Sequence, residues 1–394
     1  MLGHGLFHWF EMAVPILLVE WIQTFSTPVD VIGVIVAVGF APIGLTALPG
    51  GLLVDKYGSN TVLLLSILGM SFGFAILALA PSILAVGVGL AVWGLFAGIY
   101  HPGGMSLIST GASHRGTVFA YHGMAGNIGT ALGPFVTASL LLVFEWRLVV
   151  MLLIIPGIFA FLYGLSTDFN EKGGVDSRSG ASKSDRGPLH LRKNATDLLY
   201  SLFPVVLVIV AFDGLFYRGF TTFLPQILRE LPAMQSIALT DALVGINVGD
   251  YIFVGVLVIG IVGQWAGGTL TEKISTEKGL TAGFSALGLL SLAFVVALPS
   301  GFRAIVLLTG LIGFFLFFVQ PMYQVAVAVY TPAETRGLSY GLTYLAEFGV
   351  GAGSIALGGF LLETYPTPSF FLTMSVFAFG AAVLALWLLI KPSY

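Results

Sequence analysis

The chain has 394 residues, of which 57% are hydrophobic and only 9% are charged, and its net charge is −3. Soluble domains carry about 25% charged residues, and no soluble fold of this length buries so much apolar surface, so the composition excludes a soluble protein. The absence of cysteine excludes disulfides, thiolate metal sites and cysteine nucleophiles.

Apolar runs long enough to cross a bilayer, about 20 residues each, follow one another along the chain. We therefore predict an all-α integral membrane protein with twelve transmembrane helices. In chain order they are expected at 3–25, 30–54, 61–80, 82–111, 117–143, 147–167, 198–227, 246–270, 279–299, 302–331, 337–363 and 369–390. The first run has no basic residues before it and contains ionisable side chains, so we interpret it as a retained helix rather than a cleaved signal.

One long polar stretch, 168–197, separates the first six runs from the last six. It holds 11 of the 16 + 19 = 35 charged residues and is rich in glycine and serine, which is typical of a flexible linker. We predict an N-terminal six-helix bundle at 1–167, a cytoplasmic linker at 168–197 and a C-terminal six-helix bundle at 198–394.

Lysine and arginine are distributed unequally between the two sides of the predicted membrane. Twelve of the 16 fall on the side of the amino terminus and the linker, three fall on the other side, and Arg218 lies within a span. Because basic residues are retained in the cytoplasm, we expect a multi-pass protein of the cell membrane with both termini cytoplasmic.

Four short segments of the first half recur in the same order in the second half, about 210–220 residues later. The pairs are Gly51–Gly58 with Gly268–Ser275, His101-Pro102 with Gln320-Pro321, Arg115-Gly116 with Arg336-Gly337, and Gly5–Phe7 with Gly214–Phe216. Parallel repeats of six helices place a binding site near the middle of the membrane, between the two halves.

Several of these segments resemble motifs of the major facilitator superfamily. The pattern Gly51-x-Leu53-x-Asp55-Lys56-x-Gly58 is similar to the family's loop between helices two and three, although Ser59 and Asn60 replace its usual basic residues. The segment from Gly268 through Glu272 to Lys273 occupies the place of a second copy, and Gly129-x-x-x-Gly133-Pro134 resembles the antiporter motif. The resemblance implies two pseudo-symmetric six-helix bundles, alternating access, and a latch at Asp55 that holds the halves together in the outward-open state.

Asp55 is expected at a cytoplasmic helix end, where a carboxylate can cap a helix or pair with a base such as Arg115. Gly51 and Gly58 are expected to permit close approach and a turn. Arg336 repeats the position of Arg115, so we assign both to the same gating motif as Lys56.

Within the superfamily, the chain looks most like the fosmidomycin-resistance-like branch. Four short motifs carry this resemblance: His8-x-x-Glu11, Tyr100-His101-Pro102, Gly126-Asn127-x-Gly129, and Tyr217-Arg218-Gly219 through Leu224-Pro225.

Ionisable residues within spans are costly and by default suggest function. His4, His8 and Glu11 are spaced to share one helical face. His8 and Glu11 form a candidate site that takes and releases a proton, whereas His4 is more simply explained by packing near the helix end.

Arg218 is the one basic residue well inside a span, and it keeps its charge, so it requires an acidic partner, a wet cavity or an anionic ligand. Glu11 and Glu347 are candidate partners across the cavity. Asp213 is five residues earlier on the same helix, about 140° around it, and is less well placed. A structural ion pair is the alternative interpretation.

The remaining candidates are polar groups within or near predicted spans. His101, Asn127, Tyr217, Gln320 and Tyr323 are assigned to the substrate or proton-coupling site. Helix packing is the alternative for Asn127, Tyr217, Gln320 and Tyr323. Glu20 and Asp250 lie near span ends and are expected to be solvated.

The leading hypothesis is a proton-coupled exporter of a small organic solute, monomeric in the bilayer and without a cofactor. Uptake or exchange of a small organic anion at Arg218 is the alternative within transport. A membrane metalloenzyme or sensor, with a metal at His8, His101 and His122, is the alternative of another class. Enzyme motifs and a phosphate-binding loop are absent, and the linker's acidic residues give no support to nucleic-acid binding.

Overall fold

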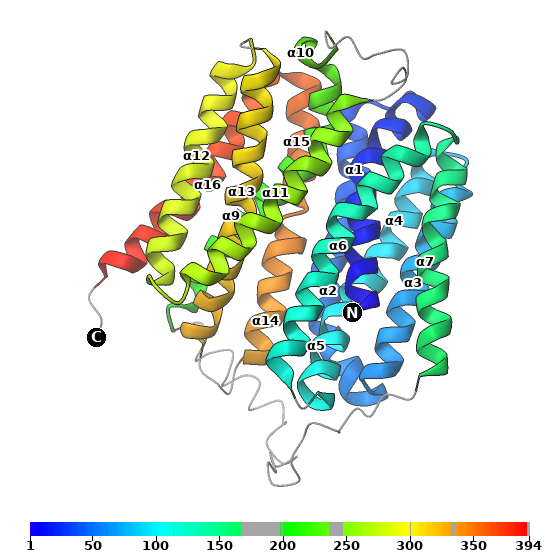
Figure 1. Ribbon diagram of the computed structural model, residues 1–394, viewed down its shortest axis with the longest axis vertical. Helices are drawn as coiled ribbons and strands as arrows, with labels where there is room; N and C mark the ends of the chain where they lie inside the picture. The colour runs from blue at the N-terminus through cyan, green and yellow to red at the C-terminus, as the bar shows by residue number, and fades with distance from the viewer. Residues whose placement is uncertain are drawn as a thin grey trace.

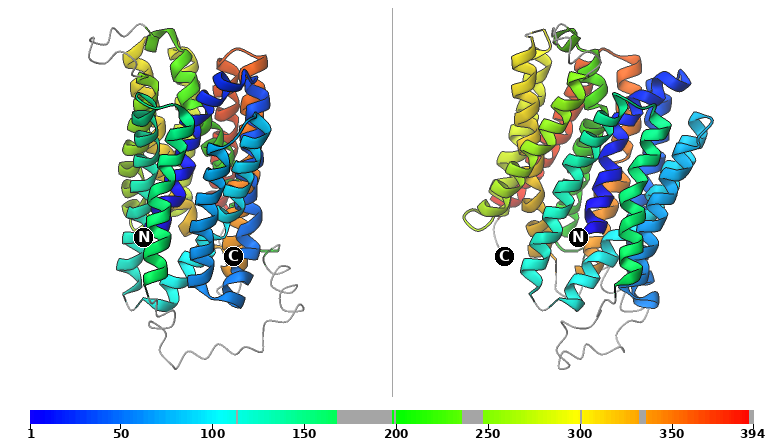
Figure 2. Two further views of the ribbon diagram at one scale, coloured as in Figure 1. Left: turned by 90° about the vertical axis from the view of Figure 1, so that its right-hand side faces the viewer. Right: turned by 45° about the vertical axis from the view of Figure 1, so that its right-hand side comes forward.

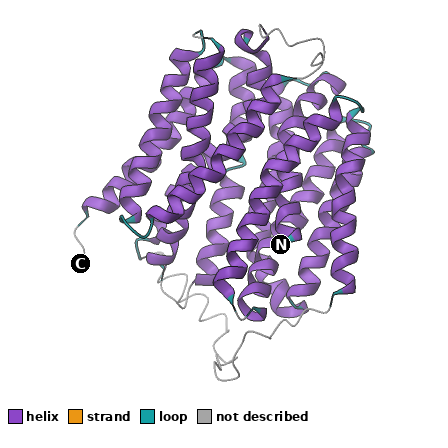
Figure 3. Cartoon of the chain, in the orientation of Figure 1, coloured by secondary structure: helices purple, strands orange, loops and turns teal. Residues whose placement is uncertain are grey.

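A computed structural model describes residues 1–112, 114–167, 198, 200–235, 247–299, 301–331 and 336–391. Within these ranges the regular structure is entirely helical, and the helices run side by side along the long axis of the molecule (Figures 1, 2 and 3). The predicted linker, 168–197, lies outside the described residues.

Twelve helices are long and apolar enough to cross a membrane, which confirms the predicted number and order. The helices before the linker are α1 (Leu2–Phe25), α2 (Val29–Tyr57), α3 (Ser59–Ala78), α4 (Ile83–Gly98), α5 (Tyr100–Gly111), α6 (Arg115–Leu141) and α7 (Trp146–Ser166). Those after it are α9 (Phe203–Glu230), the short α10 (Pro232–Gln235), α11 (Val248–Leu270), α12 (Thr276–Ala297), α13 (Phe302–Val329), α14 (Arg336–Tyr344), η4 (Leu345–Val350), α15 (Gly353–Thr364) and α16 (Pro368–Ile390).

Two of the predicted spans are interrupted. The fourth, expected as one helix over 82–111, breaks at Ile99 between α4 and α5, since Pro102 has no N–H to donate to the carbonyl of Gly98. The eleventh consists of α14, the π-helix η4 and α15. π-Helical turns within α-helices are frequent at functional sites.

The two halves pack by the same glycine contacts, which gives the internal repeat a structural counterpart. On α4, a Cβ at Gly94 would overlap the carbonyl oxygen of Gly39 on α2. On α13, a Cβ at Gly313 would approach the carbonyl oxygen of Val256 on α11. These helix pairs occupy equivalent places in the two halves, and small residues allow such close approach in membranes.

The outer surface of the bundle is apolar where a soluble protein would be polar. Trp265 is 70% exposed, and Leu79 and Val296 are more than 70% exposed. Apolar side chains of this size are stable at a surface that faces lipid, so their exposure agrees with a membrane-embedded bundle.

The halves meet where α1 packs against α9, where α2 packs against α14, η4 and α15, and where α6 packs against α11. We call the end at which α9 ends and α10 lies the upper end, as drawn in Figure 1, and the opposite end the lower end.

Candidate functional site

An ion pair joins the two halves in the interior of the protein. The guanidinium of Arg218 on α9 donates from Nη1 to Oε1 of Glu11 on α1, and the two side chains are 2% and 0% exposed. Breaking a buried pair by removing one partner is strongly destabilising, because the other charge is left unpaired away from water. The candidate partner of Arg218 is therefore Glu11 in this conformation, and neither Asp213 nor Glu347 takes that place.

His8 is the second partner of the Glu11 carboxylate. Its Nδ1 lies 2.7 Å from Oε2 of Glu11, one helical turn away on α1, as their spacing on a common face predicts. Each oxygen of the Glu11 carboxylate thus has a partner: Arg218 from the opposite half on Oε1, and His8 from its own helix on Oε2.

Aromatic rings surround the guanidinium of Arg218. Its Cζ lies 4.1 Å from the ring centre of Phe348 on η4, 4.9 Å from that of Tyr217 and 5.5 Å from that of Phe40 on α2. An arginine over aromatic faces gains cation–π attraction, which increases when water is excluded. These contacts hold the cation between the halves. Sequence reasoning did not identify Phe40 or Phe348 as part of the site.

Two further carboxylates lie beside this pair in the C-terminal half. Asp213 on α9 is 1% exposed, and the charges that act on it most strongly are those of Glu347 and Arg218. The backbone of Glu347 packs directly against Gly214, where a Cβ would approach its Cα to 2.8 Å. Tyr323 on α13 is 2% exposed and lies against Glu347. The central cluster, defined as Glu11, Asp213, Arg218 and Glu347, therefore has three acids for one arginine.

A group of histidines extends from this cluster toward the lower end. The rings of His4 and His122 stack at 4.0 Å between centres, and Nδ1 of His4 lies 2.7 Å from the carbonyl oxygen of His122. His101 on α5 stacks on Tyr344 of α14 at 4.9 Å, which is a contact between the halves. His122 is buried, with 5% of the residue exposed.

The metal alternative placed His8, His101 and His122 in one ligand set. The rings of His8 and His101 are 6.4 Å apart, and the described part of the chain contains no group of three or more His, Cys, Asp or Glu side chains arranged to hold a metal ion.

At the upper end, a second ionic network joins the halves. Arg229 on α9 donates to both oxygens of Asp250 on α11, at 2.8 and 2.6 Å, and to Oε1 of Glu20 on α1 at 3.1 Å. The expectation that Asp250 is solvated is wrong, because its side chain is only 3% exposed. We call Glu20, Arg229 and Asp250 the upper network.

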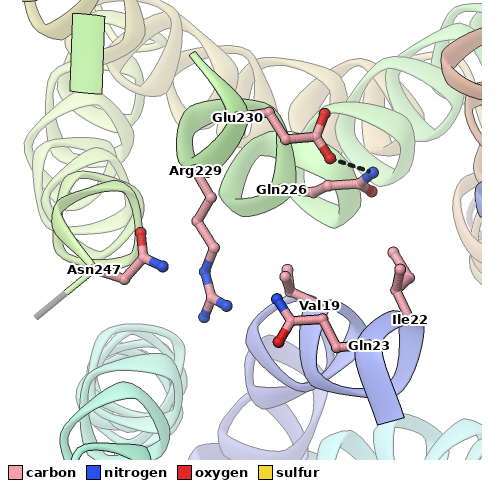
Figure 4. Close-up of a pocket in the computed structure, with 7 residues that line it drawn as sticks. All are labelled: Val19, Ile22, Gln23, Gln226, Arg229, Glu230 and Asn247. Atoms are coloured by element: carbon pink, nitrogen blue, oxygen red, sulfur yellow. Dashed lines mark hydrogen bonds between the residues drawn. The ribbon is translucent and has the colours of Figure 1, made fainter. Parts of the chain in front are cut away.

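The upper network borders a cavity of about 350 Å³ between α1 and α9. Val19, Ile22 and Gln23 line it from α1, and Arg229 extends into the space between the helices (Figure 4). Two other polar contacts link the halves nearby: the N–H of Val29 donates to Glu363 at 2.7 Å, and the hydroxyls of Ser139 and Tyr251 are 3.4 Å apart. These contacts join the halves at the upper end, and we call this arrangement the conformation with a closed upper end.

The other predicted site residues are more dispersed. Asn127 on α6 and Gln320 on α13 are half-buried, and among the described residues neither forms a hydrogen bond with Glu11 or Arg218. The nearby glycines of α6 have a clear packing role, since a Cβ at Gly129 or Gly133 would overlap the backbone of Gly5 or Trp9 on α1. Pro134 follows within the same helix.

The predicted latch residues lie at the lower end. Gly58 ends α2 with a φ of 83°, a conformation that favours glycine, so the expected turn is present. The expected close approach is not at Gly51, which has nothing within 4 Å of a Cβ, but at Gly50, which packs against Ile99 and Pro102.

The charged members of the gating motif are exposed where they are described. Asp55 and Lys56 are exposed, with Lys56 over the ring of Tyr57 at 4.9 Å. In the second copy Glu272 is exposed and Gly268 faces open space. The side chains of Arg115 and Arg336 lie outside what the structure describes, so their pairing stays a prediction.

A family model described as Major Facilitator Superfamily matches residues 1–355. The chain belongs to this superfamily. Membership makes it a membrane transporter rather than an enzyme, and the two six-helix sets around the central cluster agree with the fold. No curated protein sequence matches the chain significantly.

Solved structures of this superfamily share the whole fold. The nucleoside transporter NupG, in a mutant form, is similar over 99% of this chain and 98% of its own, with a TM-score of 0.73 and 14% identity. A bacterial homolog of the human lysosomal transporter Spinster, in an inward-facing and occupied conformation, is similar over 98% and 95%, with a TM-score of 0.71 and 15% identity. At such identities the likeness extends to the fold alone.

Proposed function

We propose that this superfamily member exports a small organic solute in exchange for protons, by alternating access around the central cluster. The observation that supports this most strongly is the buried ion pair between Glu11 and Arg218, which joins helices of opposite halves. Arg218 keeps its positive charge, and the three acids of the central cluster outnumber it. The net charge of the cluster therefore changes whenever a proton binds or a polar solute enters.

The two ends of the molecule act as alternate gates in this proposal. The upper network, together with the Val29–Glu363 contact, closes the upper end and has to separate when the site opens there. The motif at Asp55 and Lys56 then joins the halves at the lower end. The excess of lysine and arginine makes the lower end cytoplasmic, with both termini and the linker on that side of the cell membrane.

We further propose that the protein acts as a monomer and belongs to the fosmidomycin-resistance-like branch. The support for the branch is the set of short motifs around Glu11, His101, Asn127 and Arg218. Three of these motifs supply residues to the central cluster or its immediate neighbours, namely Glu11, His101 and Arg218.

Uptake or exchange of a small organic anion is a second candidate. One observation favours it: Nε of Arg218 has no hydrogen-bond partner among the described residues, which leaves a donor for an anion. The surplus of carboxylates around this donor opposes it, because Asp213 and Glu347 repel an anion that approaches Arg218.

Proton-driven accumulation in proteoliposomes tests the proposed function. The solute is first found by a thermal-shift screen of phosphonates, carboxylates and nucleosides, the last because NupG is a nucleoside transporter. One-for-one exchange should hold about a tenfold solute gradient per pH unit, since tenfold corresponds to about 1.4 kcal/mol.

A protonophore should abolish this accumulation, and vesicles without protein are the control. Equal equilibration with and without the pH gradient would mean that the protein is a passive facilitator and that the proton coupling is wrong.

A further inference from the structure

Asp213 is the member of the central cluster whose charge the protein does not satisfy. Its side chain is 1% exposed, and neither Oδ1 nor Oδ2 has a hydrogen-bond partner among the residues that the structure describes. Glu11, in contrast, has a partner on each oxygen. An ionised carboxylate that is buried without donors is costly, and a proton removes that cost.

The neighbours of Asp213 do not supply the missing positive charge. On its own helix, Arg218 attracts it, but that guanidinium is already hydrogen-bonded to Glu11 and held by aromatic rings. From η4, Glu347 repels it, and two acids this close do not readily ionise together.

The other titratable groups near the cluster are neutral hydroxyls or lie across the interface. The hydroxyls of Tyr217 on α9 and Tyr323 on α13 are close enough to Asp213 to interact with it electrostatically. On α1, His8 is bound to Glu11, and that carboxylate adds further negative charge. The central cluster therefore has a surplus of acid that a cation can neutralise.

We propose that Asp213 holds the coupling proton in the conformation with a closed upper end, while Glu11 remains the counter-ion of Arg218. Glu347 receives the proton first, because it is partly exposed whereas Asp213 is not, and it lies on the π-helix that packs against Gly214. In this step the O–H bond of Glu347 breaks as an O–H bond forms on the Asp213 carboxyl. After the change of conformation, Asp213 gives up the proton, which returns to water at the other side. This assignment rests on the function proposed above. It places the coupling proton on Asp213 and not on His8 or Glu11.

Infrared spectroscopy of the purified full-length protein tests the assignment without a transported solute. The parent protein at neutral pH should show the carbonyl stretch of a protonated, buried carboxyl group, and Asp213→Asn should remove it. Asp250→Asn is the matched control, because Asp250 is equally buried but is paired with Arg229 and should contribute no such band. An unchanged band in Asp213→Asn, or no band in the parent, would overturn the proposal.

Thermal unfolding at several pH values gives a second readout. If the folded state binds a proton at Asp213 more tightly than the unfolded state does, raising the pH favours unfolding. The apparent Tm of the parent should therefore fall as the pH rises above neutral, and Asp213→Asn should show a smaller fall than Asp250→Asn. A different outcome would be a parent that lacks the infrared band and whose Tm rises with sodium, with no such rise in Asp213→Asn. That outcome would identify sodium as the ligand and overturn the assignment of a proton to Asp213.

Transport separates this assignment from the proposed function. Asp213→Asn should lose accumulation driven by a pH gradient but retain solute exchange. If the infrared band behaves as expected and the parent ignores the gradient, the proton is on Asp213 and the proposed coupling is wrong. If the parent follows the gradient and Asp213→Asn does so equally, the coupling stands and the assignment to Asp213 is wrong.

Discussion

The Arg218→Ala variant is expected to lose both stability and transport. Alanine leaves Glu11 buried with His8 as its remaining partner and adds a third unbalanced acid to Asp213 and Glu347. Removing one partner of a buried ion pair costs about 3–5 kcal/mol, so much of the protein should be unfolded or aggregated after extraction in detergent. Size-exclusion chromatography and thermal unfolding measure this loss.

A second substitution distinguishes the structural role of Arg218 from its functional role. Combining Arg218→Ala with Glu11→Gln removes both charges of the pair and should restore most of the lost stability, whereas transport should stay absent. Arg218→Lys should fold but transport poorly, since an ammonium does not reproduce the planar guanidinium. Arg147→Ala is the control, because Arg147 binds the carbonyl of Ala80 away from the cluster. Full transport by Arg218→Ala would contradict any functional role for this residue.

The Gly129→Val variant should fail to form a stable bundle. The Cβ at this position would overlap the carbonyl oxygen of Gly5 and lie 2.9 Å from its Cα, so the backbones of α1 and α6 would have to separate. Overpacking typically costs about 1–3 kcal/mol even where side chains can adjust, and here the obstacle is backbone. Separation of these helices would also move Glu11 away from Arg218.

Gly123→Val is the matched control on the same helix, because nothing lies within 4 Å of a Cβ at Gly123. Both variants introduce the same β-branched residue into α6, so that a difference in apparent Tm reports the contact with α1 alone. Equal Tm values for the two variants would show that α1 and α6 are not packed as described.

The number and order of the spans follow from composition, but their interruptions follow only in part. The break at Ile99 has a local signal in Pro102, because a proline within a span removes a backbone donor and can kink the helix. The π-helix η4 has no such signal. It lies where Gly349 packs against Gly44 of α2 and Gly351 packs against Gly214 of α9, so it depends on two helices that are distant in sequence.

The central cluster could be predicted residue by residue but not pair by pair. An arginine within a span requires an acid, and Glu11, Asp213 and Glu347 were the available acids. Helical periodicity assigns residues to faces of one helix, but the pairing of Arg218 with Glu11 spans 207 positions and depends on how the halves dock.

The upper network was missed for a different reason. Charges near span ends are usually solvated, and nothing local to Glu20, Arg229 or Asp250 indicates burial. Their pairing depends on the contact of α9 with both α1 and α11.

Distances between labels on the two halves test alternating access most directly, and the absence of native cysteines allows clean labelling. One pair, at Thr24 and Gln235, reports the upper end, and another, at His114 and Lys273, reports the lower end; all four residues are exposed.

Glu20→Gln removes one contact between the halves but leaves Arg229 paired with Asp250. It should therefore raise the population of molecules with an open upper end. The increase should be up to about fivefold, which corresponds to a loss of about 1 kcal/mol. Glu230→Gln is the control, since Glu230 binds Gln226 of its own helix. The account predicts that the upper distance lengthens as the lower distance shortens. Distances that remain fixed, or that lengthen together, at every pH and in Glu20→Gln would contradict it.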